Sequence, residues 1–215
     1  MKIAIIGTGN VGKSLGTSFR RAGHDVTYAA QDVRKTRQVA TEVGAHAAGS
    51  PSAAAADADV VVLAVPYGAA AGVAREITGQ TAGKVVIDAT NPLKPDYSGL
   101  TTEGGPSGAE RIADAAGDAN VVKAFNTVFA SVQANPRING QPADALIAGD
   151  DEAAKATVAE LVSSIGMRPI DAGSLAAAHE LEALAWLNIA LQLRTGGNWS
   201  SSFVLLGAPE KAIAA

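Results

Sequence analysis

The turn that follows the first apolar run of the chain carries the clearest chemical signal, because its residues match two patterns that bind phosphate. Gly7, Gly9 and Gly12 spell the G-x-G-x-x-G of dinucleotide-binding loops, while Gly7, Gly12, Lys13 and Ser14 spell the G-x-x-x-x-G-K-S of the P-loop. Both patterns open a helix, where unpaired backbone N–H groups and the positive end of the helix dipole attract an anion. The sequence therefore predicts a phosphate group at this turn.

Three features favour a dinucleotide over a nucleoside triphosphate. Gly9 has no function in a P-loop, but in a dinucleotide loop it lets the backbone approach a pyrophosphate. Gly16 allows close packing of the helix on the strand, and a second strand at 25–30 completes a βαβ unit of about 30 residues. A triphosphatase also needs a Mg²⁺ carboxylate, which Asp88 could imitate, and a base-reading N-K-x-D, which follows no predicted strand. Under the dinucleotide interpretation, Lys13 is a solvated surface lysine.

Composition limits the classes of partner. The net charge of −4 offers no basic field for nucleic acid, and the absence of cysteine excludes disulfides and thiolate metal sites. No apolar run approaches the roughly 20 residues that span a bilayer, and the first apolar run is too short for a signal peptide. We therefore expect a cytoplasmic protein with neither a nucleic-acid nor a membrane partner.

Apolar runs alternate with helical segments, which is typical of an α/β fold with a doubly wound parallel sheet of the Rossmann type. The predicted strands cover 2–6, 25–30, 45–48, 60–65, 84–88 and 121–124, and the predicted helices cover 11–22, 34–43, a short piece from 51, 68–78 and 107–116. This order predicts a complete dinucleotide-binding domain over 1–130, with its ligand crevice at the carboxyl ends of the strands.

The pattern changes after Ala130. A strand at 143–148, a helix at 151–165 and a strand at 167–171 form one more βαβ-like unit, followed by a long helix at 174–194 and a Gly/Ser-rich tail at 195–202. The long helix is apolar on more than one face, so it is either deeply buried or shared with a second subunit. We interpret 131–215 as a small C-terminal α/β extension that carries the second-substrate and dimer region, within one compact body.

Three loops that follow central strands are expected to converge on the crevice. They cover 64–67, 88–93 and 123–128. Asn91 and Asn126 occupy two of these loops, where a side-chain amide either caps its own turn or contacts a cofactor. Their position at successive strand ends favours cofactor contact. The strand ends carry no acid–base pair, so the sequence predicts neither a catalytic residue nor a metal site.

The segments GTGNVG, AVPY, DATNPL and KAFNT, in this order and near these spacings, resemble the NADPH-dependent reductases of the factor-420 deazaflavin coenzyme. That family is also similar to the cytosolic domain of the membrane ferric reductases. The resemblance implies hydride transfer between NADPH and a second planar redox cofactor, a deazaflavin or a flavin, in a homodimer.

The resemblance also implies positions for the cofactors. In the glycine-rich turn, Thr8, Asn10 and Val11 would hold the pyrophosphate. At the end of the fourth strand, Ala64, Val65 and Pro66 would flank the cofactor. Asn126 and the backbone N–H of Ala130 would border the nicotinamide. A flavin-like ring would stack between the Asn126 loop and the tail. There the glycines at 196–197 either approach the ligand or cap the helix, and Trp199 and Phe203 either form an apolar wall or pack in the core or the dimer interface.

The end of the second strand bears on the choice of nucleotide. NAD enzymes carry a carboxylate there, which repels a 2′-phosphate. This chain has Ala30 and Gln31, with Arg34 and Lys35 opening the next helix, and we expect Asp32 to cap that helix. These residues favour NADP.

Two other functions remain open. A Rossmann half of this kind also resembles the imine and carbonyl reductases of the 6-phosphogluconate-dehydrogenase-like group. That group places a catalytic lysine on its interdomain helix, whereas residues 174–194 contain no lysine. A redox sensor that binds NADP without turnover is the third possibility.

Overall fold

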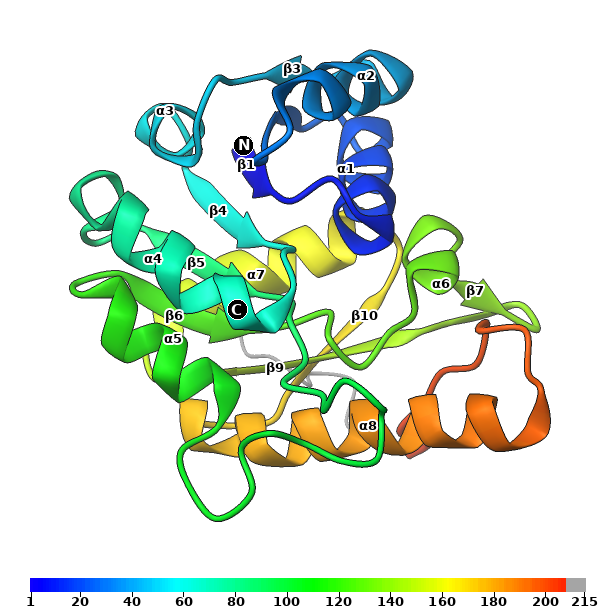
Figure 1. Ribbon diagram of the computed structural model, residues 1–215. Coiled ribbons are helices and arrows are strands. Elements are labelled where there is room, and N and C mark those ends of the chain that lie inside the picture. Colours follow the sequence, from blue (N-terminus) through cyan, green and yellow to red (C-terminus); the bar gives the residue numbers. More distant parts are fainter. Residues whose placement is uncertain (208–215) are drawn as a thin grey trace.

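The computed structural model describes residues 1–207, which fold around one central sheet (Figure 1). The eight strands, in spatial order, are β10 (Arg168–Asp171), β9 (Asp144–Gly149), β6 (Asn120–Lys123), β5 (Val85–Asp88), β4 (Val60–Leu63), β1 (Lys2–Ile6), β2 (Asp25–Ala29) and β3 (His46–Ala47). All neighbours run parallel except β9, which is antiparallel to β6. The predicted Rossmann sheet is thus confirmed, and the βαβ-like unit of the extension joins the same sheet.

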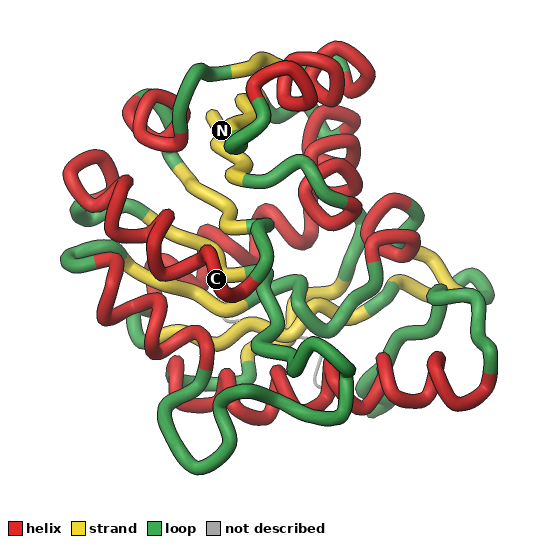
Figure 2. The backbone as a smooth tube through the Cα atoms, viewed as in Figure 1, coloured by secondary structure: helices red, strands yellow, loops and turns green. Residues whose placement is uncertain are grey.

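Helices cover both faces of the sheet (Figure 2). They are α1 (Asn10–Arg21), α2 (Val33–Val43), α3 (Pro51–Ala56), α4 (Tyr67–Thr81), α5 (Gly108–Ala116), α6 (Ala130–Ala134), α7 (Glu152–Ser164) and α8 (Ala178–Thr195), the last preceded by a 3₁₀ turn at Leu175–Ala177. Among the helices of residues 1–207, none is both long and apolar enough to cross a membrane.

Two hydrophobic cores form because side chains alternate across the strands. In β1, Ile3 and Ile5 pack with residues of α1, α2 and α7 on one face. Ala4 and Ile6 pack with residues of α3, α4 and α5 on the other face. The strands are therefore apolar on both sides, which explains the unbroken run of β4.

The structure corrects several predicted boundaries. β4 ends at Leu63 instead of Val65, because the chain leaves the sheet there to enter α4, whose N-cap is Pro66. The long helix begins at Ala178, after the 3₁₀ turn. Three elements were not predicted: the five-residue α6, and the strands β7 (Arg137–Ile138) and β8 (Gln141–Pro142), which form a hairpin.

Candidate active site

The glycine-rich turn joins β1 to α1, and its three glycines serve different purposes. Gly7 has φ +125°, and an added Cβ there would overlap the carbonyl oxygen of Ala64. A Cβ on Gly12 would overlap the carbonyl oxygen of Gly7. Gly9, the N-cap of α1, has an ordinary extended backbone, and a Cβ on it would meet no atom within 4 Å. Gly7 and Gly12 therefore let the turn fold, whereas Gly9 leaves open space outside the helix N-terminus.

Tyr28 of β2 stabilises the glycine-rich turn by a hydrogen bond. Its hydroxyl donates a hydrogen bond to the carbonyl oxygen of Gly12 at 3.0 Å, and burial raises the pKa of the phenol well above its usual value, so it stays protonated. A Cβ on Gly16 would overlap this hydroxyl. The predicted close approach of helix and strand at Gly16 is confirmed.

The two residues that a triphosphatase would need both pair with other side chains. Lys13 is half-exposed, and its Nζ lies 2.6 Å from Oε2 of Glu42 on α2. Asp88 is fully buried and lies 2.8 Å from Nζ of Lys123, while its other oxygen accepts the amide N–H of Thr90. Because Asp88 is not free to bind Mg²⁺, the geometry favours a dinucleotide at the turn.

The end of β2 carries the expected helix cap. Oδ1 of Asp32 accepts the backbone N–H groups of Arg34 and Lys35, each at 3.0 Å. These hydrogen bonds, above all that from Lys35, lower the pKa of the Asp32 carboxyl below its usual value. The side chains of Gln31, Arg34 and Lys35 are exposed. They are free to contact a phosphate at this corner.

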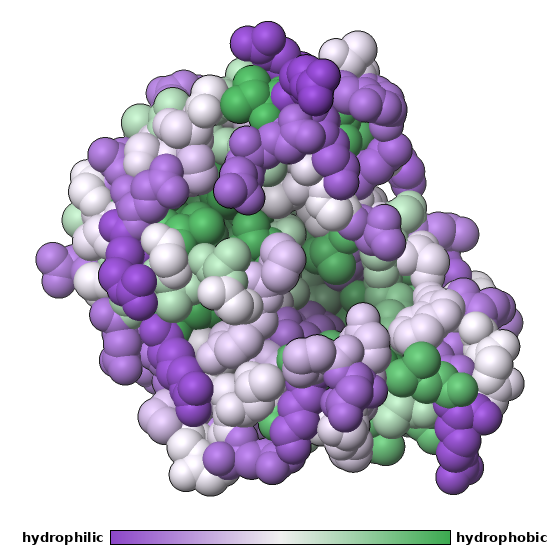
Figure 3. Space-filling view, viewed as in Figure 1, coloured by the Kyte–Doolittle hydropathy of each residue, from purple (hydrophilic) through white to green (hydrophobic). Residues whose placement is uncertain are grey.

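A cavity of about 730 Å³ opens at the carboxyl ends of the strands and extends to α8 and the tail; Figure 3 shows the hollow, with apolar surface along part of its rim. Five predicted site residues line it, namely Asn10, Val11, Asn91, Asn126 and Ala130. The others do not line it and lie in the turns after β1, β2 and β4 or in the first turns of α1 and α2; they are Gly7, Thr8, Gly9, Gly12, Ala30, Gln31, Arg34, Lys35, Ala64, Val65 and Pro66. Their contacts with a cofactor remain predictions.

Asn91 and Asn126 bind each other across two loops, an arrangement we call the amide bridge. Nδ2 of Asn91 donates to the carbonyl oxygen of Asn126, and Nδ2 of Asn126 donates to Oδ1 of Asn91, both at 3.0 Å. Nδ2 of Asn126 also donates to the carbonyl oxygen of Leu181 on α8, at 3.1 Å. These acceptors fix which way the Asn126 amide faces.

The fixed amide leaves acceptors without a partner at the cavity. Oδ1 of Asn126 is buried and has no hydrogen-bond partner among the described residues, and the same holds for Oγ1 of Thr127. Both residues line the cavity. Because buried polar atoms are almost always paired, these oxygens indicate a site for a polar ligand.

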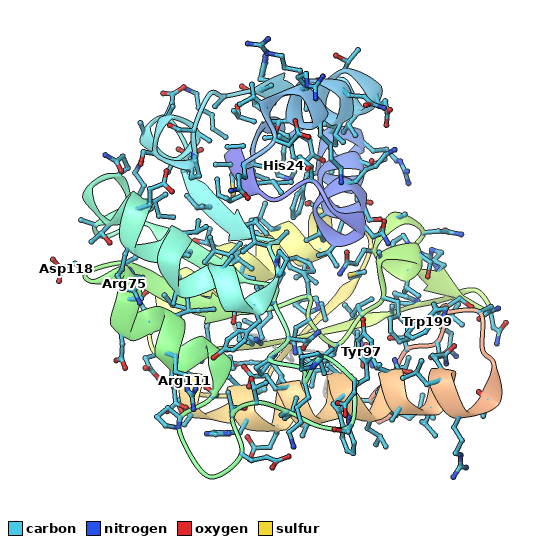
Figure 4. All side chains as sticks on the ribbon, in the orientation of Figure 1. His24, Arg75, Tyr97, Arg111, Asp118 and Trp199 are labelled. Atoms are coloured by element: carbon cyan, nitrogen blue, oxygen red, sulfur yellow. The ribbon has the colours of Figure 1, made fainter. Side chains whose placement is uncertain are left out.

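Aromatic side chains form part of the wall, and of these the sequence reasoning proposed only Trp199. Tyr97, Phe125 and Trp199 line the cavity with backbone φ angles of +58°, +65° and +59°. This left-handed conformation costs a residue with a Cβ roughly 1–2 kcal/mol. Figure 4 labels Tyr97 on the loop between β5 and α5 and Trp199 on the tail, both close to α8. The rings come from distant segments, so no local sequence pattern could group them.

The tail folds back along α8. Gly196 ends the helix in the left-handed conformation, which confirms the helix-cap interpretation, and a Cβ on Gly197 would overlap the Gln192 side chain. Oε1 of Gln192 accepts the N–H of Trp199 at 2.9 Å, and Trp199 packs edge-on against Phe129. Trp199 therefore belongs to the predicted apolar wall, whereas Phe203 is not among the residues that line the cavity.

A buried ion cluster of Asp88, Lys123 and Glu182 lies behind the strand ends. Nζ of Lys123 donates to Oδ2 of Asp88 at 2.8 Å, to Oε1 of Glu182 at 3.0 Å and to the carbonyl oxygen of Thr90 at 2.7 Å. All three charged side chains are fully buried. The sequence reasoning missed this cluster, although a lysine inside the apolar run Val121–Ala124 was a usable signal.

Comparison with known proteins identifies the family. Residues 2–92 match the family model described as NADP oxidoreductase coenzyme F420-dependent. The F420-dependent NADP reductase of Methanothermobacter thermautotrophicus is 35% identical in an alignment that covers 90% of each chain.

Two further proteins are similar over most of the chain. A crystal structure of a putative F420-dependent NADP reductase from Arthrobacter sp. FB24 superposes with a TM-score of 0.86 at 30% identity, covering 95% of this chain and 99% of that one. Metalloreductase STEAP3 of Rattus norvegicus is 31% identical over 85% of this chain, which spans 36% of the length of that protein. The family resemblance read from the sequence is confirmed, and the chain belongs to the F420-dependent NADP reductases, a family of oxidoreductases.

Proposed function

We propose that this protein transfers a hydride between NADPH and a deazaflavin coenzyme, coenzyme F420. The observation that carries the proposal is the cavity that begins at the N-terminus of α1 and ends at the aromatic tail, with the unpartnered Oδ1 of Asn126 in its wall. One ligand at the glycine-rich turn and a second against the tail would meet beside Asn126.

The residues of the chain fit such a pair of ligands. Bound NADPH supplies a hydride, which the deazaflavin takes up together with one proton from solvent. The N–H groups at the start of α1 would hold the pyrophosphate, with Gly9 leaving room for it. Oδ1 of Asn126 would accept a hydrogen bond from the carboxamide of the nicotinamide. Tyr97 and Trp199 would exclude water and face the flat ring of the acceptor.

NADP is the nucleotide that the corner after β2 favours. Oδ1 of Asp32 accepts two backbone hydrogen bonds from its own helix, so this carboxylate would be a weaker acceptor for the ribose hydroxyls. Arg34 and Lys35 stand beside it with exposed cationic side chains. A 2′-phosphate would find two cations and the amide of Gln31 there.

An acceptor screen tests the function. Purified protein is mixed with NADPH and, separately, with coenzyme F420, FMN, a ferric chelate, a cyclic imine and a ketone, and NADPH oxidation is followed by absorbance. Oxidation with F420 alone, or with F420 far faster than with the rest, supports the proposal. Turnover of the imine or ketone identifies a carbonyl or imine reductase instead, and tight NADPH binding without turnover identifies a sensor.

We also propose a homodimer, with α8 in the interface. Leu187, Leu191 and Leu193 on this helix are 38–51% exposed, which is unusual for three leucines on one element. In this arrangement residues 1–130 bind the nucleotide and the extension supplies the second-substrate and dimer surfaces. Sedimentation of wild type and of Leu187→Glu/Leu191→Glu tests it: a dimer that the double variant converts to monomer supports the interface.

We also propose a cytoplasmic protein. Its net charge of −4 favours small redox cofactors over nucleic acid as partners. Retention of nucleic acid through purification would contradict this.

A further inference from the structure

The buried ion cluster and the amide bridge lie in adjacent layers built from the same three segments. The loop after β5 contributes Thr90 to the cluster and the next residue, Asn91, to the bridge. The end of β6 contributes Lys123 to the cluster and Asn126, three residues on, to the bridge. The helix α8 contributes both Glu182 and its neighbour Leu181.

All three N–H donors of Lys123 are used within the cluster. An ammonium group has three N–H donors, and Lys123 directs them to three different acceptors. Glu182 accepts the backbone N–H groups of Gly108 and Ala109, at 3.0 and 3.2 Å, in the first turn of α5. The cluster therefore ties four segments together: the loop after β5, the end of β6, α8 and the start of α5.

Such a cluster has little freedom to rearrange. Each charge is removed from water, so any movement that breaks one contact leaves a buried charge or a polar group without a partner. Asn126, in contrast, is held only by neutral hydrogen bonds and lies between Phe125 and Thr127 in the cavity wall. The rigid ion cluster therefore lies immediately behind the amide bridge, whose Asn126 would contact the ligand.

We infer that Glu182, through its contact with Lys123, is a positioning residue that sets α8 against β6 and so holds Oδ1 of Asn126 in its place in the cavity. This inference rests on the proposed function for its kinetic consequence, because Asn126 would contact the nicotinamide. Glu182 acts through Lys123 and Leu181 and does not itself line the cavity.

The test replaces Glu182 with Gln, which keeps the size and removes the charge. The matched control is Asp171→Asn, because Asp171 also pairs with a buried lysine, Lys155, at 2.9 Å and also accepts a backbone N–H, that of Gly173. Asp171 ends β10, which is separated from β6 by β9, and it does not line the cavity.

Hydride transfer from NADPH to coenzyme F420 and the Kd of NADPH are measured for both variants and for Asn126→Leu. We expect Glu182→Gln to lower kcat by about ten- to a hundredfold, as small misplacements of reacting groups do, with the Kd of NADPH changed less than about threefold. The control should keep both values. Adding Glu182→Gln to Asn126→Leu should lower kcat no further, because both changes act on one contact.

A purely structural contribution would lower the denaturation midpoint of Glu182→Gln while kcat stayed at the wild-type value, and that result would overturn the inference. So would independent, multiplicative losses in the double variant. If Glu182→Gln does not fold, Asp88→Asn makes the same comparison from the other carboxylate of the cluster.

Hydrogen exchange separates this inference from the proposed function. In the wild type, the side-chain amide of Asn126 should exchange slowly, because it is buried and donates two hydrogen bonds. Glu182→Gln should speed this exchange and Asp171→Asn should not. If wild type does not reduce F420, the proposed function fails, and the exchange rates still decide the positioning; equal exchange in all three proteins would refute it.

Discussion

Gly9→Ala should separate the folding of the glycine-rich turn from its binding of phosphate. Gly9 has φ −76° and ψ −173°, a conformation open to alanine, and a Cβ there would find no atom within 4 Å. A glycine-to-alanine change at such a position stabilises by about 0.4–1 kcal/mol, because the unfolded chain loses entropy. For a chain of this size the melting temperature should rise by roughly 1–4 °C.

The same methyl group should weaken nucleotide binding. It would occupy the space that a pyrophosphate at the N-terminus of α1 needs, and inserting a methyl group into a filled space costs about 1–3 kcal/mol. That cost corresponds to a Kd for NADPH about 5- to 140-fold weaker. Titration calorimetry measures it directly. Thermal unfolding provides a second measure, since NADPH at 100 times its Kd should stabilise the wild type by about 2.7 kcal/mol and the variant by less.

The control is Gly12→Ala in the same turn. A Cβ there would overlap the carbonyl oxygen of Gly7, so this variant should lose stability as well as binding. The reasoning is refuted if Gly9→Ala binds NADPH as tightly as wild type, which would place the pyrophosphate elsewhere. It is also refuted if Gly9→Ala is destabilised as strongly as Gly12→Ala.

Three further predictions concern other parts of the site. Asn126→Leu should abolish most hydride transfer to F420 while the Kd of NADPH stays nearly unchanged; full activity in stopped-flow assays would contradict the two-ligand geometry. Arg34→Ala should weaken the binding of NADPH about tenfold and leave the binding of NADH unchanged, because the Arg34 side chain would contact the 2′-phosphate. The control Arg75→Ala, on α4, should change the Kd of neither nucleotide. Gly16→Ala should lower the free energy of unfolding by about 1–3 kcal/mol, because the added Cβ overlaps the Tyr28 hydroxyl. The control Gly72→Ala has open space around the added Cβ and should raise the free energy of unfolding by up to about 1 kcal/mol. Urea titrations measure both.

Local patterns explain why much of the fold could be predicted. Runs such as Val60–Leu63 are apolar at every position, as strands buried on both faces are, and Asp32 precedes its helix as a cap should. The hairpin β7–β8 was missed although Asn139-Gly140 is a strong signal for its turn, and both residues have positive φ. The direction of β9 could not be predicted, because it is defined by pairing with β6, a strand distant in sequence, through Val122–Gly149 and Lys123–Ala148.

Some residues of the candidate site could likewise be predicted from local patterns, and others could not. The glycine-rich turn and the Asn126 loop were predicted, since each is a contiguous motif that follows a strand. Ala185 and Ile189 of α8 line the cavity only because the extension folds back on the first domain's loops. Apolar residues on a helix do not reveal whether they will meet a core, a partner or a ligand.

The left-handed backbone of Tyr97, Phe125 and Trp199 has a consequence for how this protein would change under selection. Glycine or asparagine adopts that conformation more easily than an aromatic residue does, so many single substitutions at these positions relieve strain. A laboratory lineage screened for heat resistance alone is therefore expected to accumulate glycine or asparagine at the exposed positions Tyr97 and Trp199. Such a lineage would lose the aromatic wall of its cavity as its melting temperature rose.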